Sequence, residues 1–326
     1  MIVITGATGH IGNVLVRQLL EKGEKVKVLV LPGEDLTPIK GLDVEKAEGD
    51  IRNLESLVKA FRGADIVFHL AAVISILPGR KKLLQEVNVI GTRNVVEACV
   101  KCGVRRLVYT SSIHALFKEP PPQFIDETIP FDPDNIVGEY AKSKVRATLE
   151  VLKGLEKGLD VVVACPTGVM GPYDYRISEA GKTIIDVAKG KCPIYIDGNQ
   201  DFADVRDSAK GIILCGEKGR KGEVYLLSGE TISVTDLLLT ASKISGAKMP
   251  KIKIPIPLAK ILSIFTSIYY KLTKTTPRLT PYSIYVLTYP AFASDKKARQ
   301  ELGYSPRPIR ESIADAIKWY RENGMV

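Results

Sequence analysis

The sequence lacks the long apolar runs that mark membrane-spanning helices. None of its hydrophobic stretches approaches the roughly 20 residues that a helix needs to cross a bilayer. Cysteine is also scarce: the chain of 326 residues has five, scattered and odd in number, which favours reduced thiols over a disulfide framework. The opening residues read as a strand and a turn rather than as an export signal. We therefore expect a cytoplasmic protein.

Patterns that bind metals or nucleic acids are missing as well. Cys99 and Cys102 form a single Cys-x-x-Cys pair without a second pair or a nearby histidine, so we interpret them as packing residues of a helix and predict no metal site. The formal net charge is +9, but lysine and arginine are spread along the chain and no nucleic-acid motif is present. We therefore expect a small molecule, and no nucleic acid, as the partner.

What the sequence does contain is a regular alternation of β-rich and helical segments in its first half. Helical periodicity separates the β-rich runs, which are found at residues 2–5, 25–31, 65–70, 106–111 and 160–164. Strands that alternate with helices form parallel sheets, because each crossover carries a helix over one face of the sheet. The pattern predicts an α/β fold with a Rossmann-type, doubly wound parallel sheet.

A glycine-rich turn, TGATGHIG, follows the first predicted strand. Gly6 would allow a tight turn, Gly9 would let the backbone approach a pyrophosphate, and Gly12 would let the helix pack closely on the strand. The N-terminus of that helix would offer its N–H groups to the phosphates. We therefore predict that NAD or NADP binds here. The expected contacts come from Gly6, Thr8, Gly9, His10, Ile11 and Gly12.

The end of the second strand bears on the choice between NAD and NADP. An acidic residue there would bind the ribose 2′-hydroxyl, whereas an arginine would bind the 2′-phosphate of NADP. Leu31 occupies this position and does neither, while Glu34 and Asp35 follow closely and would repel a phosphate. We therefore favour NAD, with NADP as the alternative. From the end of the next strand, Asp50 and Ile51 are placed to reach the adenine.

Two further patterns indicate where the chemistry takes place. Tyr140 and Lys144 are four residues apart on a predicted helix and so share a face. A cation at Lys144 would lower the pKa of the Tyr140 phenol and make it a usable acid or base. The hydroxyl of Ser112, or alternatively of Ser111, would emerge at the carboxyl edge of the sheet, where it could stabilise charge on a substrate carbonyl.

In their order along the chain, these motifs resemble those of the extended short-chain dehydrogenases/reductases, also called the NAD-dependent epimerase/dehydratase family. The matching segments are TGATGHIG, HLAA at 69–72, VNVIGT at 87–92, TSS at 110–112, YAKSK at 140–144, CPTGVMGP at 165–172 and DVRD at 204–207. The resemblance covers nearly the whole chain and implies a catalytic triad of Ser112, Tyr140 and Lys144. It also implies further residues at the cofactor site: Leu70, Ala71, Ala72, Asn88, Thr110, Pro166 and Thr167.

The alternation of strands and helices stops after Pro166, where proline and glycine become frequent. We therefore expect an NAD(P)-binding domain at residues 1–165. Residues 166–326 would mainly form a smaller substrate-binding lobe, with parts that return to the Rossmann sheet. The resemblance also implies a homodimer that forms through the helices at residues 83–102 and 138–157.

Three functions compete within this family. The chain could be a carbonyl or alcohol oxidoreductase, similar to dihydroflavonol reductases and 3β-hydroxysteroid dehydrogenases, a nucleotide-sugar epimerase, or a cofactor-binding scaffold without turnover. The run Ser112–His114 lacks the acidic pair of sugar dehydratases, and Cys165–Gly168 lacks the asparagine of many nucleotide-sugar enzymes. We therefore favour the oxidoreductase, with the epimerase as the alternative. Substrate contacts are expected from His114, Phe117, Tyr173 and Arg176, with ordinary loop packing as the competing interpretation.

An apolar helix with basic flanks is predicted at residues 258–272. Its large apolar residues recur at helical spacing. They are Leu258, Ile261, Leu262, Phe265, Ile268 and Leu272. We favour a lid helix that packs these residues on the smaller lobe. The competing interpretation is an interfacial helix that contacts lipid and admits a lipid-like substrate.

Overall fold

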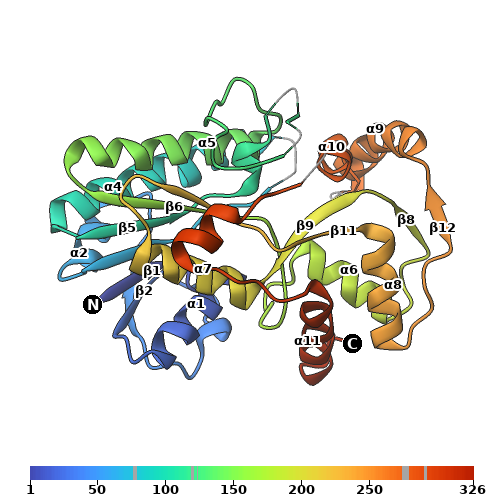
Figure 1. Ribbon diagram of the computed structural model, residues 1–326, viewed down its shortest axis with the longest axis horizontal. Helices are drawn as coiled ribbons and strands as arrows, with labels where there is room; N and C mark the ends of the chain where they lie inside the picture. The colour runs from blue at the N-terminus through green and yellow to red at the C-terminus, as the bar shows by residue number, and fades with distance from the viewer. Residues whose placement is uncertain (76–78, 119–120, 123, 274–278, 290–291) are drawn as a thin grey trace.

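The computed structural model describes residues 1–75, 79–118, 121–122, 124–273, 279–289 and 292–326, without the side chains of residues 267–273. It has two lobes, a larger one built on a central sheet and a smaller one beyond the ends of its strands (Figure 1). No helix in the described ranges has the length and hydropathy that are needed to span a bilayer.

The larger lobe contains seven parallel strands in the order β10-β6-β5-β4-β1-β2-β3. Their bounds are β1 Ile2–Thr5, β2 Val26–Val30, β3 Glu45–Glu48, β4 Ile66–His69, β5 Arg106–Thr110, β6 Asp160–Pro166 and β10 Val224–Leu227. The order reverses at β1, which has β4 on one side and β2 on the other. This arrangement confirms the predicted Rossmann-type sheet.

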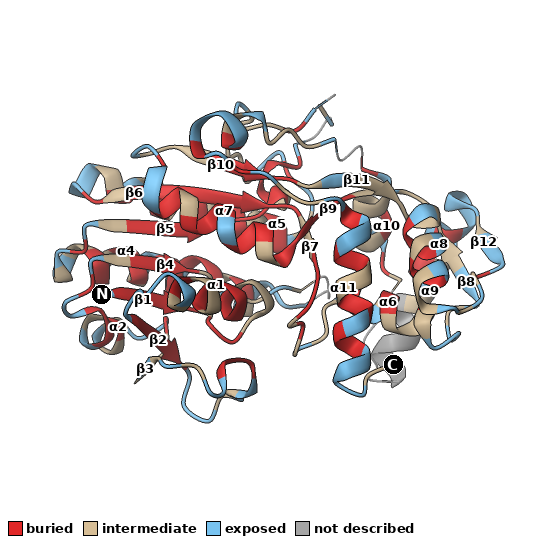
Figure 2. Ribbon diagram, turned by 60° about the horizontal axis from the view of Figure 1, so that its bottom comes forward, coloured by how far each residue is buried: buried red, intermediate tan, exposed pale blue. Residues whose placement is uncertain are grey.

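Helices cover both faces of this sheet. One face carries α2 (Leu54–Phe61), α4 (Gly91–Cys102) and α5 (Glu139–Leu152), and the other carries α1 (His10–Glu21) and α7 (Val205–Lys218). The side chains of β1 alternate between the two layers: Val3 lies in one core, and Ile2 and Ile4 lie in the other. Except for the charged edge strand β3, burial of the strands on both faces explains their nearly continuous apolar sequences (Figure 2).

The smaller lobe is mixed. A three-stranded sheet of order β11-β9-β7 and a parallel pair of β12 and β8 lie beside its helices. The bounds are β7 Gly168–Met170, α6 Glu179–Ala188, β8 Ile194–Ile196, β9 Asn199–Asp204, β11 Glu230–Ser233, α8 Val234–Ser245, β12 Ile252–Ile254, α9 Ile256–Thr273, α10 Pro281–Thr288 and α11 Ile309–Glu322. The chain after β6 builds this lobe and also supplies β10 and α7 to the larger one.

The remaining helical segments are short. They comprise the 3₁₀ segments η1 Thr37–Ile39, η3 Ile113–Leu116 and η4 Lys153–Lys157, the helix α3 Lys81–Leu84, and the π-helical segments η2 Gln85–Ile90 and η5 Ala298–Leu302. The first π-helical segment joins α3 to α4 in one continuous helix and contains Asn88. The side chain of Asn88 forms two hydrogen bonds with the backbone of Val73 and donates a third to the Ser143 hydroxyl on α5. Asn88 therefore lies beside the helix that carries Tyr140 and Lys144.

A charged cluster at the start of α7 ties the two lobes together. The fully buried carboxylate of Asp204 accepts hydrogen bonds from the backbone and the guanidinium of Arg206, and Arg206 also donates to Asp315 on α11. Asp207, the residue after Arg206, accepts hydrogen bonds from the backbone and the guanidinium of Arg307, which precedes α11. Burial raises the pKa of Asp204, but the hydrogen bonds from Arg206 outweigh it and hold this pKa below its usual value.

Asp204→Asn should lower the free energy of unfolding by about 3 kcal/mol, because it leaves a partly buried guanidinium without one of its carboxylates.

The Asp204 pKa is lower in the folded chain than in the unfolded one. Its stabilisation is therefore present above about pH 4 and is lost as the pH falls through the folded value. Urea unfolding at pH 7 and at lower pH would measure both effects. Asp315→Asn, at the exposed end of the same cluster, should cost less than about 1 kcal/mol; equal losses in the two variants would contradict this account.

Candidate active site

The glycine-rich turn between β1 and α1 is folded too tightly to accept a side chain at Gly6 or Gly12. A Cβ on Gly12 would lie 2.1 Å from the carbonyl oxygen of Gly6, and a Cβ on Gly6 would lie 2.6 Å from the backbone nitrogen of Ala71. The φ angle of Gly6 is +76°, which also favours glycine. Helix α1 begins at His10, and no side chain caps its N-terminus. Its first N–H groups are therefore available to an anion such as a pyrophosphate.

A buried relay of hydroxyls and an imidazole holds the neighbouring strand ends. The Thr5 hydroxyl lies 2.7 Å from Nδ1 of His69 and accepts from the backbone N–H of Ala71, while Nε2 of His69 lies 3.0 Å from the Thr92 hydroxyl. Burial lowers the pKa of His69 to about 3, so the ring is neutral. These hydrogen bonds fix the loop Leu70–Ala72 against the glycine-rich turn. Both lie at the reversal point of the sheet, which is where open α/β sheets bind their ligands.

Leu31 directly follows β2 and has no acidic group, but Glu34 brings a carboxylate to this end of the strand. Its carboxylate accepts hydrogen bonds from Thr8 in the turn at 2.5 Å, from the Leu31 N–H at 2.9 Å, and from Arg176 at 2.7 Å. Partial burial raises the pKa of Glu34, and these three donors together bring it below its usual value. The side chain of Leu31, which was predicted to contact the cofactor, is exposed. The carboxylate therefore stays charged beside the turn.

At the end of β3, Asp50 and Ile51 separate into different environments. The Asp50 carboxylate is paired with the backbone and guanidinium of Arg52. The Ile51 side chain is buried against Gly91, while its carbonyl accepts from Asn94. Of these two side chains, only that of Asp50 can offer a polar group at this edge.

The three residues of the predicted triad converge beyond β5. Ser112 follows the strand and caps η3, its hydroxyl accepting from the His114 N–H at 3.2 Å. Tyr140 lies on the first turn of α5 and shares a hydrogen bond with Ser112. Nζ of Lys144, one turn further on, donates to the Thr110 carbonyl at 2.7 Å and lies over the ring of Tyr109. All three side chains of the triad are buried.

Burial, not mutual attraction, dominates the protonation of the triad. It raises the pKa of Tyr140 to about 12, against an opposing effect of the Ser112 hydrogen bond, and lowers the pKa of Lys144 to about 7. In the chain by itself, burial outweighs any lowering of the Tyr140 pKa by Lys144.

Comparison with known proteins places this site in a family. The family model for the NAD-dependent epimerase/dehydratase family matches residues 2–228. The chain belongs to this family. The resemblance to the extended short-chain dehydrogenases/reductases is thereby confirmed.

Relatives and solved structures match over nearly the full length of the chain. Sterol demethylase protein B of Methylococcus capsulatus is 34% identical over 328 residues, which cover 99% of each chain. A putative dihydroflavonol 4-reductase of Synechocystis is 30% identical and covers 99% of this chain and 95% of its own. The crystal structure of gox2253 matches with a TM-score of 0.88 at 34% identity, covering 100% and 99% of the two chains. A Thermus thermophilus UDP-glucose 4-epimerase, solved with NAD, has the same fold with a TM-score of 0.79 at 23% identity, covering 98% of each chain.

In this member of the epimerase/dehydratase family, the predicted substrate residues fall into two separate groups. His114 and Phe117 lie beside the triad, with the ring centroid of His114 5.8 Å from that of Tyr140. Arg176 instead donates to Thr8 and Glu34 at the nucleotide turn. Tyr173 stacks under Arg17 of α1 and contacts Trp319 of α11.

Predicted cofactor residues near this second group also have protein partners. Nε2 of His10 bonds with the Pro172 carbonyl at 2.9 Å, so the start of α1 is joined to the segment after β7. At the end of β6, Pro166 and Thr167 are buried beside β10, where the Thr167 N–H donates to Leu227. The Thr110 hydroxyl is buried and has no hydrogen-bond partner among the described residues.

Tyr282 and Tyr285 of α10, together with Tyr289 directly after this helix, complete the surroundings of His114 and were not predicted. Tyr282 bonds with Nδ1 of His114 at 3.1 Å, and its ring lies 2.2 Å from where a Cβ on Gly138 would stand. Tyr289 stacks on Phe117 at 4.3 Å between ring centroids, and Tyr285 lies between the two. Burial lowers the pKa of His114 to about 4. This aromatic cluster is therefore uncharged. The spacing of 282, 285 and 289 on one helical face was a usable signal.

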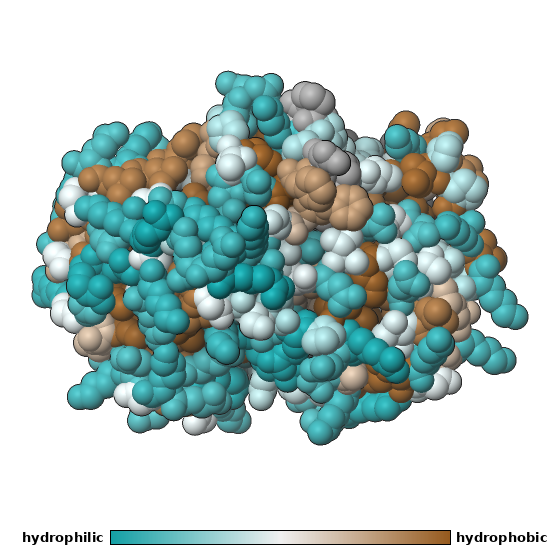
Figure 3. Space-filling model, in the orientation of Figure 1, coloured by the Kyte–Doolittle hydropathy of each residue, from teal (hydrophilic) through white to brown (hydrophobic). Residues whose placement is uncertain are grey.

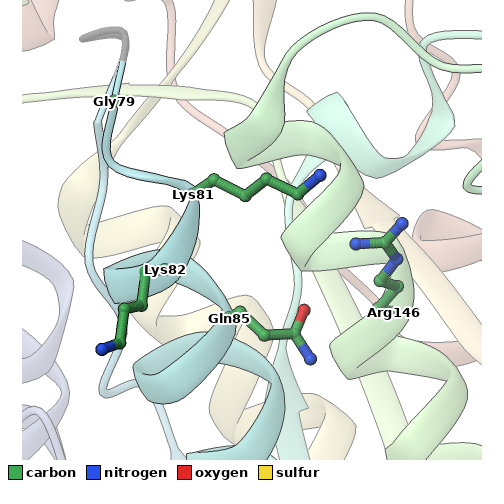
Figure 4. A pocket seen from close by; sticks show the side chains of 5 residues that line it. All are labelled: Gly79, Lys81, Lys82, Gln85 and Arg146. Carbon is green, nitrogen blue, oxygen red and sulfur yellow. The ribbon is translucent and has the colours of Figure 1, made fainter.

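A hollow of about 740 Å³ elsewhere on the surface contains no triad residue (Figure 4). It lies between α3 and α5, and its lining residues are Gly79, Lys81, Lys82, Gln85 and Arg146. We assign it no part in the active site.

Glu34→Gln should raise the affinity for NADPH relative to NADH by about tenfold. The charged carboxylate repels a 2′-phosphate, and its removal also frees Arg176 to bind that phosphate. Separate titrations with NADH and NADPH, followed by nicotinamide fluorescence, would measure the ratio. Asp35→Asn is the matched comparison and should shift the ratio less, because the exposed Asp35 carboxylate accepts its hydrogen bonds from Thr37 and not from Thr8 or Arg176; an equal shift in both variants would contradict the role assigned to Glu34.

Proposed function

We propose that this chain is an NAD(P)-dependent oxidoreductase that transfers a hydride between nicotinamide and a carbonyl or secondary alcohol. The observation that carries the proposal is the convergence of Ser112, Tyr140 and Lys144 at the carboxyl edge of the sheet that also holds the glycine turn. The tight cradle of the turn and the open N-terminus of α1 fit a dinucleotide. When bound, the nicotinamide supplies or accepts the hydride, and in its oxidised form it brings a positive charge to the site.

Each member of the triad has a distinct role in this reaction. Ser112 donates a hydrogen bond to the carbonyl oxygen and stabilises the negative charge that develops there. Tyr140 donates its phenolic proton to the same oxygen in the reducing direction, and takes that proton back in the oxidising direction. Because the pKa of Tyr140 is about 12, the phenol is a proton donor at neutral pH. The Lys144 amine, which is held on the Thr110 carbonyl, stabilises the Tyr140 phenolate when the amine is protonated.

The surroundings of the triad favour an apolar, ring-containing substrate over a nucleotide sugar. The cluster of His114, Phe117, Tyr282, Tyr285 and Tyr289 is aromatic and uncharged, and it offers no cation to a diphosphate. The two relatives carry names that refer to sterols and flavonols, which agrees with this substrate class. A nucleotide-sugar epimerase with the same triad and tightly bound NAD is the alternative, supported by the shared fold of the Thermus enzyme.

Tyr140→Phe should lower kcat by about 10² to 10⁴ while leaving the NADH dissociation constant within about twofold, because the ring stays and only the proton donor is lost. Nicotinamide absorbance would follow turnover with a panel of apolar cyclic ketones, and fluorescence titration would follow binding. Tyr195→Phe, on β8 and outside the site, should have no effect on either quantity.

Unchanged turnover of Tyr140→Phe would refute the assigned proton donor. UDP-sugars belong in the same substrate panel. Inversion of a UDP-sugar without net change in nicotinamide absorbance, together with no ketone reduction, would favour the epimerase instead.

A further inference from the structure

Helix α9 exposes its large apolar side chains and buries its small ones. The exposed fractions are 47% for Leu258, 55% for Ile261, 59% for Ile264 and 63% for Phe265. By contrast, Ala259 and Ser263 are almost completely buried. The prediction that Leu258, Ile261 and Phe265 pack on the smaller lobe is therefore wrong. The predicted Ile268 and Leu272 lie outside the described side chains.

The exposed residues form one continuous face. At 100° per residue, Ile264, Pro257, Ile261, Phe265 and Leu258 follow one another around the helix, with Lys260 at one border. The opposite side packs on α10, and the Thr266 hydroxyl donates to the Leu279 carbonyl there. Figure 3 shows hydrophobic side chains gathered at the end of the molecule where α9 lies. Exposed apolar faces of this kind mark interaction sites.

The chain segment that contains α9 carries side-chain charge of a single sign. Between Asp236 and Asp295 the sequence has no acidic residue. The same stretch carries eight basic residues, which are Lys243, Lys248, Lys251, Lys253, Lys260, Lys271, Lys274 and Arg278. Their combined positive charge is nearly as large as the formal net charge of the whole chain, +9. A surface that is both apolar and basic complements an anionic lipid headgroup region.

We propose that the apolar face of α9, defined by Leu258, Ile261, Ile264 and Phe265, docks on the surface of an anionic lipid bilayer. The helix would lie in the interface and would not span it, with its apolar face among the acyl chains and the flanking lysines at the headgroups. A second copy of the chain fits this face less well, because apposed copies would bring two basic segments together.

Docking at α9 would bring the active site to the membrane. Helix α10 packs on α9 and carries Tyr282, which bonds with His114 beside Tyr140. An apolar alcohol or ketone dissolved in the bilayer could then reach the aromatic cluster without crossing water. This last step rests on the proposed oxidoreductase function, whereas the docking itself does not.

Flotation of the full chain with vesicles tests the docking. Vesicles of phosphatidylcholine with about one third phosphatidylglycerol should bind the protein at low salt, and vesicles of phosphatidylcholine alone should bind it more weakly. The double variant Ile261→Ser/Phe265→Ser should reduce the partition coefficient at least about tenfold. Leu239→Ser, which alters an exposed leucine of α8, should leave it unchanged.

A charge reversal separates electrostatic from apolar binding. Lys260→Glu should weaken binding to the anionic vesicles severalfold, whereas Lys59→Glu, on the exposed side of α2, should not. Failure of the wild-type chain to float with anionic vesicles, or equal binding by the α9 variants, would overturn the proposal. A change from dimer to monomer in the double variant, without any vesicle binding by the wild type, would assign the face to a second copy instead. Vesicle binding without ketone reduction would contradict only the proposed function.

Discussion

The close approach of three backbone segments at the reversal point of the sheet is the constraint on which the site depends. The Gly6 carbonyl stands where a Gly12 side chain would be, and Ala71 stands where a Gly6 side chain would be. Only glycine allows the first strand, the first helix and the loop after β4 to meet at this distance. The meeting leaves an uncapped helix N-terminus beside the carboxyl ends of β1 and β4. The buried Thr5–His69 pair then holds the two strand ends in place.

The proposed reaction centre is built on the neighbouring strand, β5. Because β4 and β5 pair in register, Ser112 emerges close to the loop that the glycine turn contacts, and α5 delivers Tyr140 to it. The aromatic cluster from α10 then surrounds His114 and limits what can approach. The same helix α10 rests on α9, whose outer face is apolar and whose flanks are basic. The proposed active site, the aromatic cluster beside it and the face of α9 proposed to dock on a membrane thus lie on connected elements of the structure.

Much of the larger lobe could be predicted from the sequence, because buried parallel strands and glycine turns leave strong local patterns. The charged edge strand Glu45–Glu48 left none, since the backbone of β2 holds it and its side chains are mostly exposed. Periodicity located α9 but assigned the wrong face to the core, because a pattern around Ile261 shows which residues share a side and not what covers it. The pKa of Tyr140 depends on burial, and the pairing of Arg176 with Glu34 depends on a contact across 142 positions; neither is written locally in the sequence.

A crystal structure of the chain grown with NADH would test the central claim most directly. The account predicts a pyrophosphate against the N–H groups at the start of α1, a ribose beside Glu34, and a nicotinamide ring next to Tyr140 and Lys144 with room for a carbonyl group at Ser112. A dinucleotide bound elsewhere, or a nicotinamide ring directed away from Tyr140, would contradict it.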